Sequence, residues 1–225
     1  MPREMFARDL QRLQDEVLIL GSMVRDAILQ AVDALKRRDL ELAGLLIDGD
    51  LQINRKRFEI EADALGLIAT QQPMGGDLRL LAAILEIVTE LERMGDYAKG
   101  ISRISLMIGH TPLIKPMIDI PLMAEKSCAM LADSLKAFVL QDEWLARQTV
   151  HRDDEIDDLY NQVYRELLTY IISDLRNLEQ ANYLLWVAHN LERAGDRVTN
   201  ICERVCFMIT GEMVEMDVED GIKSL

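Results

Sequence analysis

The chain has 225 residues and carries 25 Lys or Arg against 39 Asp or Glu, so that its formal charge at pH 7 is −14. A hydrophobic content of 49% is enough to bury a core, which excludes a disordered acidic tail, and the length fits one sizeable domain or two small ones. The negative charge disfavours nucleic acid and anionic membrane surfaces as partners, because their phosphate groups repel it. The apolar runs are shorter than the roughly 18–20 residues of a membrane span. The first residues contain no apolar signal region, and three Cys make no disulfide framework. We therefore expect a cytoplasmic protein that does not insert into the membrane.

The composition and the spacing of apolar residues predict an all-α fold with long helices. Aromatic residues make up only 5% of the chain, and Gly and Pro are scarce, with 12 and 5 residues. Apolar residues recur at steps of three and four from Phe6 to Leu35, which is the spacing of one helix face. The same spacing returns from Leu184 to Met208 as a heptad-like seam, which favours packing against neighbouring helices.

Residues that start or stop helices divide the chain into about six helices, three before residue 110 and three after residue 116. Asp39 is the expected N-cap of the second helix, and Asp77 that of the third. The densest group of breakers contains three Pro and is expected to connect two domains. In chain order, the breaks lie at 39–40, 71–77, 109–121, 141–142 and 173–177.

A motif that occurs twice indicates an internal repeat. Leu91–Asp96 reads LERMGD and returns 100 residues later in Leu191–Asp196, which reads LERAGD. A repeat unit of this length is a whole three-helix domain rather than one turn of a solenoid. We therefore predict two tandem, pseudo-symmetric three-helix bundles, residues 1–110 and 111–225, the second ending in a short C-terminal tail. Glycine costs a helix roughly 1 kcal/mol relative to alanine, so its presence in both copies suggests that a neighbour or a ligand approaches closely there.

Acidic side chains are paired at i, i+4 in both halves. Glu92 and Asp96 form one such pair, and Asp50 with Asn54 forms another on the preceding helix. Both pairs are equally far from the turn between their helices, so an antiparallel hairpin brings them to the same level, and the second half repeats this arrangement. Because the pairs flank seam residues, we expect the carboxylates on the outer flank of the bundle and not in a closed core site. The candidate metal ligands are Asp50, Glu92, Asp96, Asp153, Asp157, Glu192 and Asp196.

The chemistry of these acids favours metal binding over an ordinary surface. Several carboxylates at one level raise one another's pKa unless a cation lies among them. Oxygen ligands alone suit hard cations such as Mg, Mn, Ca or iron, and they do not choose among them. The competing interpretation is a solvated helix face, on which Arg93 and Arg193 neutralise neighbouring acids in ion pairs worth about 0–1 kcal/mol.

The sequence offers no catalytic constellation, and we predict that the protein is not an enzyme. A di-iron carboxylate enzyme needs Glu-x-x-His on core-facing helix positions, and this pattern is absent. His189 precedes Glu192 by three residues, the reverse order, and is at most an auxiliary ligand. Cys202 and Cys206 are also four residues apart, and buried structural cysteines are their simplest interpretation.

Together these motifs resemble the PhoU family, the phosphate-uptake regulators of bacteria and archaea. The resemblance extends from the first amphipathic helix to about Gly211. It rests on the two LERxGD motifs, on the turn that reads Gln-Pro followed by Asp-Leu-Arg, and on the acidic pair of the second half. These residues are Leu91–Asp96, Leu191–Asp196 with Asn200 and Ile201, Gln72 and Pro73 with Asp77–Arg79, and Asp153 with Ile156 and Asp157.

This resemblance implies a fold, a site and a role. The fold is six helices in two bundles with pseudo-twofold symmetry, in a chain that forms a homodimer. The acidic motifs would bind multinuclear clusters of iron or zinc on the bundle surface, with Mg or Mn as the other candidates, and Asn54 departs from the acidic pattern of the family. The role is an adaptor that restrains phosphate uptake and the phosphate-starvation response. It would link the ATPase subunit of the phosphate ABC transporter to a sensor histidine kinase. The alternatives are a metal-storage or metal-sensing protein and, third, a plain helical scaffold.

Overall fold

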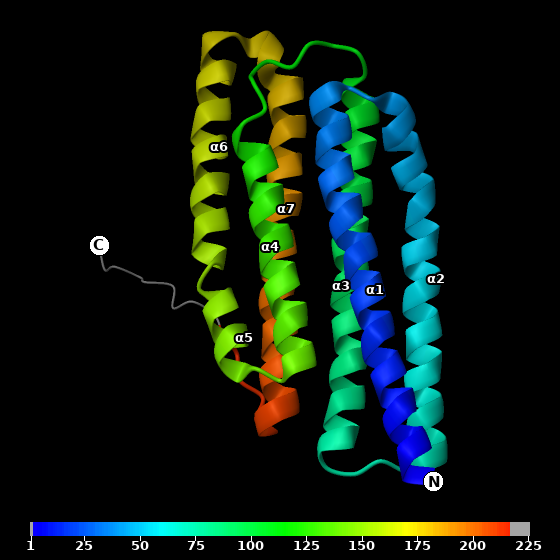
Figure 1. Cartoon of the computed structure of the whole chain (residues 1–225). Helices are drawn as coiled ribbons and strands as arrows, with labels where there is room; N and C mark the ends of the chain where they lie inside the picture. Colours follow the sequence, from blue (N-terminus) through cyan, green and yellow to red (C-terminus); the bar gives the residue numbers. More distant parts are fainter. Residues whose placement is uncertain (1, 217–225) are drawn as a thin grey trace, which may run out of the picture.

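The computed structural model describes residues 2–216, with side chains from residue 4, and these are organised entirely around helices (Figure 1). The prediction of an all-α chain with six long helices is confirmed. One short helix, α5, and one turn of 3₁₀ helix, η1, are additions that the sequence did not predict. The elements are α1 (Pro2–Arg37), α2 (Leu40–Gln71), α3 (Gly76–Ile108), α4 (Asp119–Leu140), α5 (Glu143–Val150), α6 (Asp153–Ser173), η1 (Leu175–Asn177) and α7 (Leu178–Thr210).

The long helices form the two expected three-helix bundles. In Figure 1, α1, α2 and α3 lie side by side as one antiparallel bundle, and α4, α6 and α7 form the other. The bundles join along α3 and α7, which pack against each other, and α1 packs against α4. As predicted, the seam residues face inward: Leu13, Val17 and Leu20 of α1 are fully buried, and so are Leu191 and Val198 of α7.

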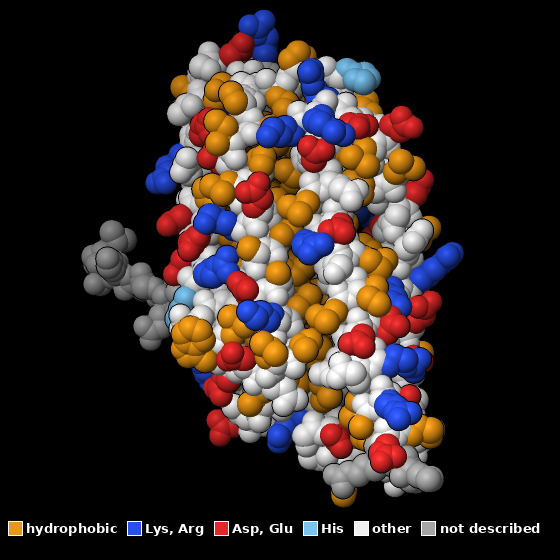
Figure 2. All heavy atoms as spheres, in the orientation of Figure 1, with side chains coloured by type: hydrophobic (Ala, Val, Ile, Leu, Met, Phe, Trp, Pro, Cys, Tyr) orange, Lys and Arg blue, Asp and Glu red, His pale blue; other side chains and the backbone are white. Residues whose placement is uncertain are grey.

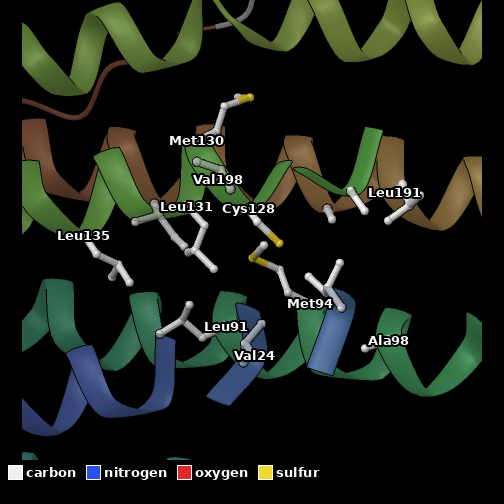
Figure 3. Close-up of a cluster of buried hydrophobic side chains, with 14 of the residues drawn as sticks. Val24, Leu91, Met94, Ala98, Cys128, Met130, Leu131, Leu135, Leu191 and Val198 are labelled. Atoms are coloured by element: carbon white, nitrogen blue, oxygen red, sulfur yellow. The ribbon is translucent and has the colours of Figure 1, made fainter. Parts of the chain in front are cut away.

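A continuous core connects the two bundles. Met94 of the first bundle points toward Cys128 of the second, and Val24 and Leu91 lie across from Leu131 (Figure 3). The three cysteines are free and buried within the second bundle. Burial raises the pKa of the Cys206 thiol to about 11 and raises the pKa of the Cys202 thiol further, so both stay protonated at neutral pH.

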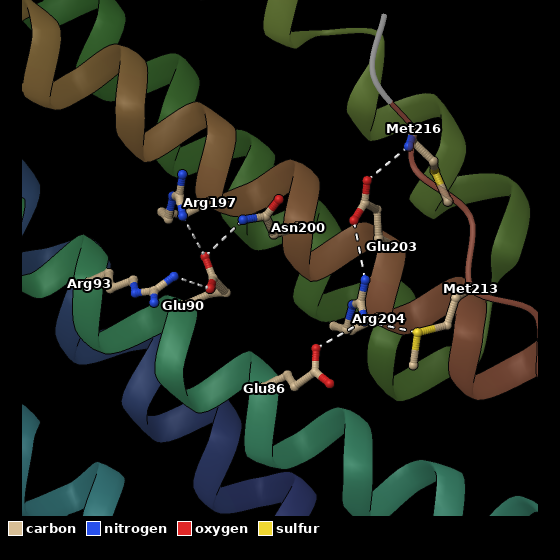
Figure 4. A network of polar contacts seen from close by, with 9 residues as sticks. All are labelled: Glu86, Glu90, Arg93, Arg197, Asn200, Glu203, Arg204, Met213 and Met216. Atoms are coloured by element: carbon tan, nitrogen blue, oxygen red, sulfur yellow. Dashed lines mark hydrogen bonds and ion pairs between the residues drawn. The ribbon is translucent and has the colours of Figure 1, made fainter.

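Polar contacts also join α3 to α7 beside the apolar core, and one of them centres on Glu90. The carboxylate of Glu90 on α3 accepts hydrogen bonds from Asn200 at 3.0 Å and from Arg197 at 3.3 Å on α7, and from Arg93 at 2.8 Å on its own helix (Figure 4). Because Glu90 is only 9% exposed, its charge depends on these donors. The contact therefore sets the register in which the two hairpins meet.

The helix boundaries follow the predicted breakers, with one correction. Asp39 caps α2, accepting a hydrogen bond from the backbone N of Leu42 at 3.0 Å. Asp77 is not the N-cap of α3, as the sequence suggested. The N-cap is Gly75, two residues earlier, which adopts a positive φ of 61°. Asp77 therefore lies in the first helical turn, where its negative charge interacts favourably with the helix dipole.

Hydrophobic side chains also gather on the surface where the bundles meet. On the face shown in Figure 2 they follow the boundary between α1 and α4, over a groove of about 480 Å³ lined by Leu18, Gly21, Leu131 and Leu135. Between residues 2 and 216, the helices all fall short of the combination of length and hydropathy that a bilayer span requires.

Candidate metal centre

Four acidic residues of the second bundle lie together across the α6–α7 hairpin. Asp153 and Asp157 are one turn apart on α6, and Glu192 and Asp196 are one turn apart on α7. Their charges interact with one another across the two helices. We call these four residues the second acidic cluster.

Burial and mutual repulsion perturb this cluster. Burial, reinforced by Asp157, Asp196 and Glu192, raises the pKa of Asp153 to about 7. Burial, together with Asp196 and Asp157, likewise raises the pKa of Glu192 to about 7, although Arg193 and Arg197 oppose the shift. The pKa of Asp157 is raised as well, first by burial and then by Asp196. The positive charges near Asp153 and Glu192 therefore do not offset the effect of burial and of the neighbouring acids on the pKa of these two carboxyl groups.

Two buried oxygens of the cluster accept no hydrogen bond. Asp153 Oδ1 and Glu192 Oε2 are inaccessible to solvent and accept no hydrogen bond, although His189 Nδ1 lies 3.3 Å from Glu192 Oε2. Thr199 Oγ1, one turn beyond Asp196, is also buried without a partner. A buried carboxylate oxygen without a donor costs free energy, which a cation at that position would recover. These oxygens fit a hard cation, and Asp153, Asp157, Glu192 and Asp196 are the residues that would hold it.

The carboxylate oxygens of the second acidic cluster do not converge on a single point. Across the side chains that the structure describes, no three His, Cys, Asp or Glu groups have the geometry to hold one ion. Asp157 is exposed and both Glu192 and Asp196 are half-buried, so rotation of these side chains can bring oxygens together without moving the helices.

Gly195 explains how α6 comes so close to α7. A Cβ at this position would fall inside the van der Waals radius of Asp153 Oδ1 and lie 3.2 Å from Ile156. In the first bundle, a Cβ at Gly95 would lie 3.1 Å from Ile53 of α2. The predicted close approach is confirmed, and the neighbour is the adjacent helix in both bundles.

The corresponding acids of the first bundle are arranged around a lysine. Lys99 Nζ lies 2.6 Å from Asp50 Oδ2, which also accepts a hydrogen bond from Asn54 Nδ2 at 3.0 Å. Asp50 is only 3% exposed, which corrects the expectation that all these carboxylates lie on the outer flank. The carboxylate can be buried because the Lys99 ammonium group neutralises it. We call Asp50, Glu92, Asp96 and Asn54 the first acidic cluster.

Arg57 brings a second positive charge to the first acidic cluster, close to Glu92. Arg57 Nε donates to Glu61 at 2.9 Å, and its guanidinium lies 3.8 Å from Glu92. Burial and the charge of Asp96 raise the pKa of Glu92, and Arg57 opposes this shift. The first cluster therefore contains internal positive charge near the buried Asp50 and the half-buried Glu92, while Asp96 is exposed to solvent.

The sequence interpretation missed Lys99 and Arg57. Lys99 follows Asp96 by three residues, and the position three residues after Asp196 is Thr199. Arg57 follows Asp50 by seven residues, and the position seven residues after Asp153 is Tyr160. A comparison of the two halves beyond the motif itself would have found both differences.

His189 lies beside the second acidic cluster, as its position before Glu192 suggested. Its Nδ1 is 3.3 Å from Glu192 Oε2, and the ring packs edge-on against Trp186 with 6.0 Å between centroids. The ring of Tyr160 is 6.2 Å away. The imidazole is therefore placed where it could add one nitrogen to the oxygens of the cluster.

The fold and the two clusters define a class: an all-α protein of two fused three-helix bundles, each with an acidic cluster across its second hairpin. The family model described as PhoU domain matches residues 17–105 and again residues 120–205. The chain belongs to the PhoU family, as its motifs indicated.

Individual relatives agree with this assignment over more than nine-tenths of the chain. The phosphate-specific transport system accessory protein PhoU homolog of Aquifex aeolicus is 36% identical over 208 residues, which cover 92% of this chain and 94% of the relative. The crystal structure of the phosphate transport system regulatory protein PhoU from Streptococcus pneumoniae superposes with a TM-score of 0.86 at 32% identity, covering 93% of this chain and 99% of the other. That of PhoU from Pseudomonas aeruginosa has a TM-score of 0.86 at 29% identity and covers 92% of this chain and 100% of the other.

Proposed function

We propose that this protein is a metal-binding accessory protein that negatively regulates phosphate uptake and the phosphate-starvation response. Membership of the PhoU family carries the regulatory part, since relatives over nine-tenths of the chain are named as accessory or regulatory proteins of phosphate transport. The metal-binding part is supported by the second acidic cluster, in which the pKa values of Asp153 and Glu192 are raised and one buried oxygen of each accepts no hydrogen bond.

The proposed metal is iron or zinc, with Mg or Mn as the other candidates. The second acidic cluster supplies only carboxylate oxygens, to which His189 can add a nitrogen, and a mixed oxygen and nitrogen set suits iron and zinc. Asp50, Glu92 and Asp96 remain candidate ligands in the first bundle. A metal there has to displace Lys99 from Asp50, so we propose that this site is the weaker one.

The proposed mode of action is contact with partners in the cytoplasm and not catalysis. The partners are the ATPase subunit of the phosphate ABC transporter and a phosphate-sensing histidine kinase, and the active form is a homodimer. We propose that the bundles of residues 1–110 and 111–225 act as two domains, which offer similar but unequal surfaces to these two partners.

The regulatory role is tested by deleting the gene and measuring an alkaline phosphatase reporter in phosphate-rich medium. We expect derepression, restored to full repression by the wild-type gene. A Glu192→Gln/Asp196→Asn gene should restore repression only partly if the metal contributes to function. A reporter that stays fully repressed in the deletion strain, with no second family member in the genome, would contradict the proposal.

Metal storage or sensing is the second candidate, because the second acidic cluster by itself suits that role equally well. Pull-down from phosphate-replete cells separates the two. Recovery of the transporter ATPase and the kinase supports the regulatory proposal, and recovery of neither supports storage.

A further inference from the structure

Helix α2 has two apolar faces, and the fold buries one of them. The helix lies at the edge of the molecule, where it packs against α1 and α3 (Figure 1). Its buried face includes Ala43, Ile53 and Ile60. A second series follows another side of the helix at steps of three and four, so its members share one face. We call this series the α2 stripe; it consists of Leu40, Gly44, Ile47, Leu51, Arg55, Phe58, Ala62, Leu65 and Ala69.

The large side chains of the α2 stripe are open to solvent. Leu51 is 61% exposed, Phe58 58% and Leu65 55%, and the two alanines of the stripe are exposed as well. From Leu40 to Ala69 the stripe extends over about 43 Å of helix. Apolar side chains at this spacing and over this length are typical of a helix that pairs with another helix. The stripe is therefore a candidate interaction surface.

The charges on α2 are ordered around Phe58. The three residues before it, 55–57, read Arg-Lys-Arg, and the charged residues that follow it are acidic, at positions 59, 61 and 63. Arg55 forms no ion pair within the part of the chain that the structure describes. The Glu59 side chain is 69% exposed and lies 3.7 Å from Lys56, an exposed ion pair of little strength. Arg55 and Glu59, four residues apart and on the same side of the stripe, are therefore available to charges of a partner.

The second bundle lacks such a stripe. At the positions of Leu51 and Phe58, α6 carries Asp154 and Asn161, and both of these side chains are exposed. A three-helix bundle of this kind therefore folds with a polar surface at these positions. The exposed apolar residues of α2 are not required by the fold of the repeat, so they point to a role outside the bundle.

We propose that two copies of this chain associate through the α2 stripe, with the two α2 helices antiparallel and centred near Phe58. The inference rests on the proposed homodimer and names its interface. In this arrangement Leu51 of one copy lies at the level of Leu65 of the other, because each is seven residues from Phe58. A twofold axis brings the same side of both helices together, so Arg55 of one copy comes within about half a helical turn of Glu59 of the other.

The order of the charges favours a second copy as the partner and antiparallel as the orientation. Antiparallel helices place the basic residues before Phe58 of each copy at the level of the acidic residues after it in the other. Parallel helices would place basic residues beside basic ones and acidic beside acidic. The surface is thus complementary to itself, as a twofold contact requires. An anionic bilayer is disfavoured by the net charge of −14.

The interface is located by sedimentation equilibrium of the full-length protein, with the folding of each variant checked by thermal melting. We expect the wild type to form a dimer. Leu65→Ser should raise the dimer Kd at least about tenfold, because an apolar contact between the two stripes is lost. Leu168→Ser changes the leucine at the corresponding position of α6 and is the matched control, which should leave the Kd unchanged. An equal Kd for Leu65→Ser and the wild type overturns the proposal.

The orientation is tested by exchanging the two charges. Arg55→Glu and Glu59→Arg should each raise the dimer Kd about fivefold, since an exposed ion pair is weak and the contact contains two of them. Arg55→Glu/Glu59→Arg in one chain should restore the wild-type Kd, because the antiparallel contact then regains both pairs with their signs reversed. A double variant that is no tighter than the single variants overturns the antiparallel contact.

The outcomes separate this inference from the proposed function. A dimer that persists unchanged in Leu65→Ser overturns the α2 interface and leaves the homodimer in place. A wild type that stays monomeric at every concentration overturns both the interface and the proposed homodimer. The phosphatase reporter in the deletion strain tests the regulatory role independently of either result.

Discussion

The two acidic clusters come from the same motif on the same fold, and they differ in how their charge is balanced. In the first cluster, Lys99 neutralises Asp50 at 2.6 Å and Arg57 approaches Glu92, while Asn54 replaces one carboxylate. In the second cluster, Thr199 occupies the position of Lys99 and Tyr160 that of Arg57. Asp157 occupies the position of Asn54.

This difference separates a structural site from a binding site. An acid that is buried with its own lysine contributes to the fold and has little capacity left for a ligand. Asp153 and Glu192 have no ion pair with a lysine or arginine among the described residues, burial and the neighbouring acids raise the pKa of each to about 7, and they therefore gain most from a metal. The two halves differ accordingly at three positions, Lys99 against Thr199, Arg57 against Tyr160, and Asn54 against Asp157.

The largest expected effect comes from removing the internal cation of the first cluster. Lys99→Met leaves Asp50 buried without a counter-charge and should lower the free energy of unfolding by about 3 kcal/mol, measured by urea denaturation. Thr199→Val, the matched change in the second bundle, should cost less than about 1 kcal/mol, because the hydroxyl makes no hydrogen bond. Adding Asp50→Asn to Lys99→Met should recover most of the loss, and failure to recover it would mean that Lys99 acts through packing alone.

Metal should stabilise the protein through the second cluster. The fold should remain intact after chelation, since the apolar seams are continuous, and zinc or iron at about 100 times its Kd should add about 2.7 kcal/mol. The melting temperature of Glu192→Gln/Asp196→Asn should respond little to the same metals. Complete unfolding of the chelated wild type at room temperature would refute the account of the core.

The metal-free protein should become more stable as the pH falls from 8 to 5. Asp153 and Glu192 have a pKa near 7 in the folded state and lower values when unfolded, so the native state binds more protons in this range and unfolding becomes harder as they bind. The gain should be on the order of 1 kcal/mol, since both side chains are partly solvated. Urea denaturation of Asp153→Asn/Glu192→Gln across the same pH range provides the comparison. An identical pH dependence in this variant and the wild type would show that the two acids do not titrate as described.

An effect of similar size is expected at the close approach of α6 and α7. Gly195→Ala introduces a methyl group against Asp153 and Ile156 and should destabilise the protein by about 1–2 kcal/mol, despite the better helix propensity of alanine. Gly66→Ala on α2 meets nothing within 4 Å and should stabilise it by about 0.5–1 kcal/mol. Thermal melts of both variants check the opposite signs. Stabilisation by both changes would mean that α6 has room to move away.

Much of this structure could be predicted because it depends on periodicity and repetition. The steps of three and four from Phe6 identified the buried face of α1, and the two LERxGD motifs located the paired bundles. Helix α5 was missed because its eight residues are too few to show a period. The N-cap at Gly75 was missed because the aspartate that follows has the stronger capping preference, while only glycine adopts the positive φ readily.

The pairing of charges was harder to predict. The i, i+4 spacing predicted which acids lie close together. Lys99 and Arg57 are outside the motif, and nothing in their local sequence shows that their side chains extend to Asp50 and Glu92. Burial of Asp50 on α2 depends on the long side chain of Lys99, which extends from α3 to the Asp50 carboxylate. Contacts of this kind are set by side-chain direction and not by the hydrophobic pattern.

The most direct test of the difference between the clusters is the metal content of three proteins purified without chelator: the wild type, Glu192→Gln/Asp196→Asn and the matched Glu92→Gln/Asp96→Asn. Elemental analysis per chain should show that the second-bundle variant loses most of its iron or zinc, while the first-bundle variant retains most of it, because Lys99 and Arg57 already neutralise that site. Equal metal content in all three proteins, or a larger loss in the first-bundle variant, would contradict the assignment of the second acidic cluster as the metal site.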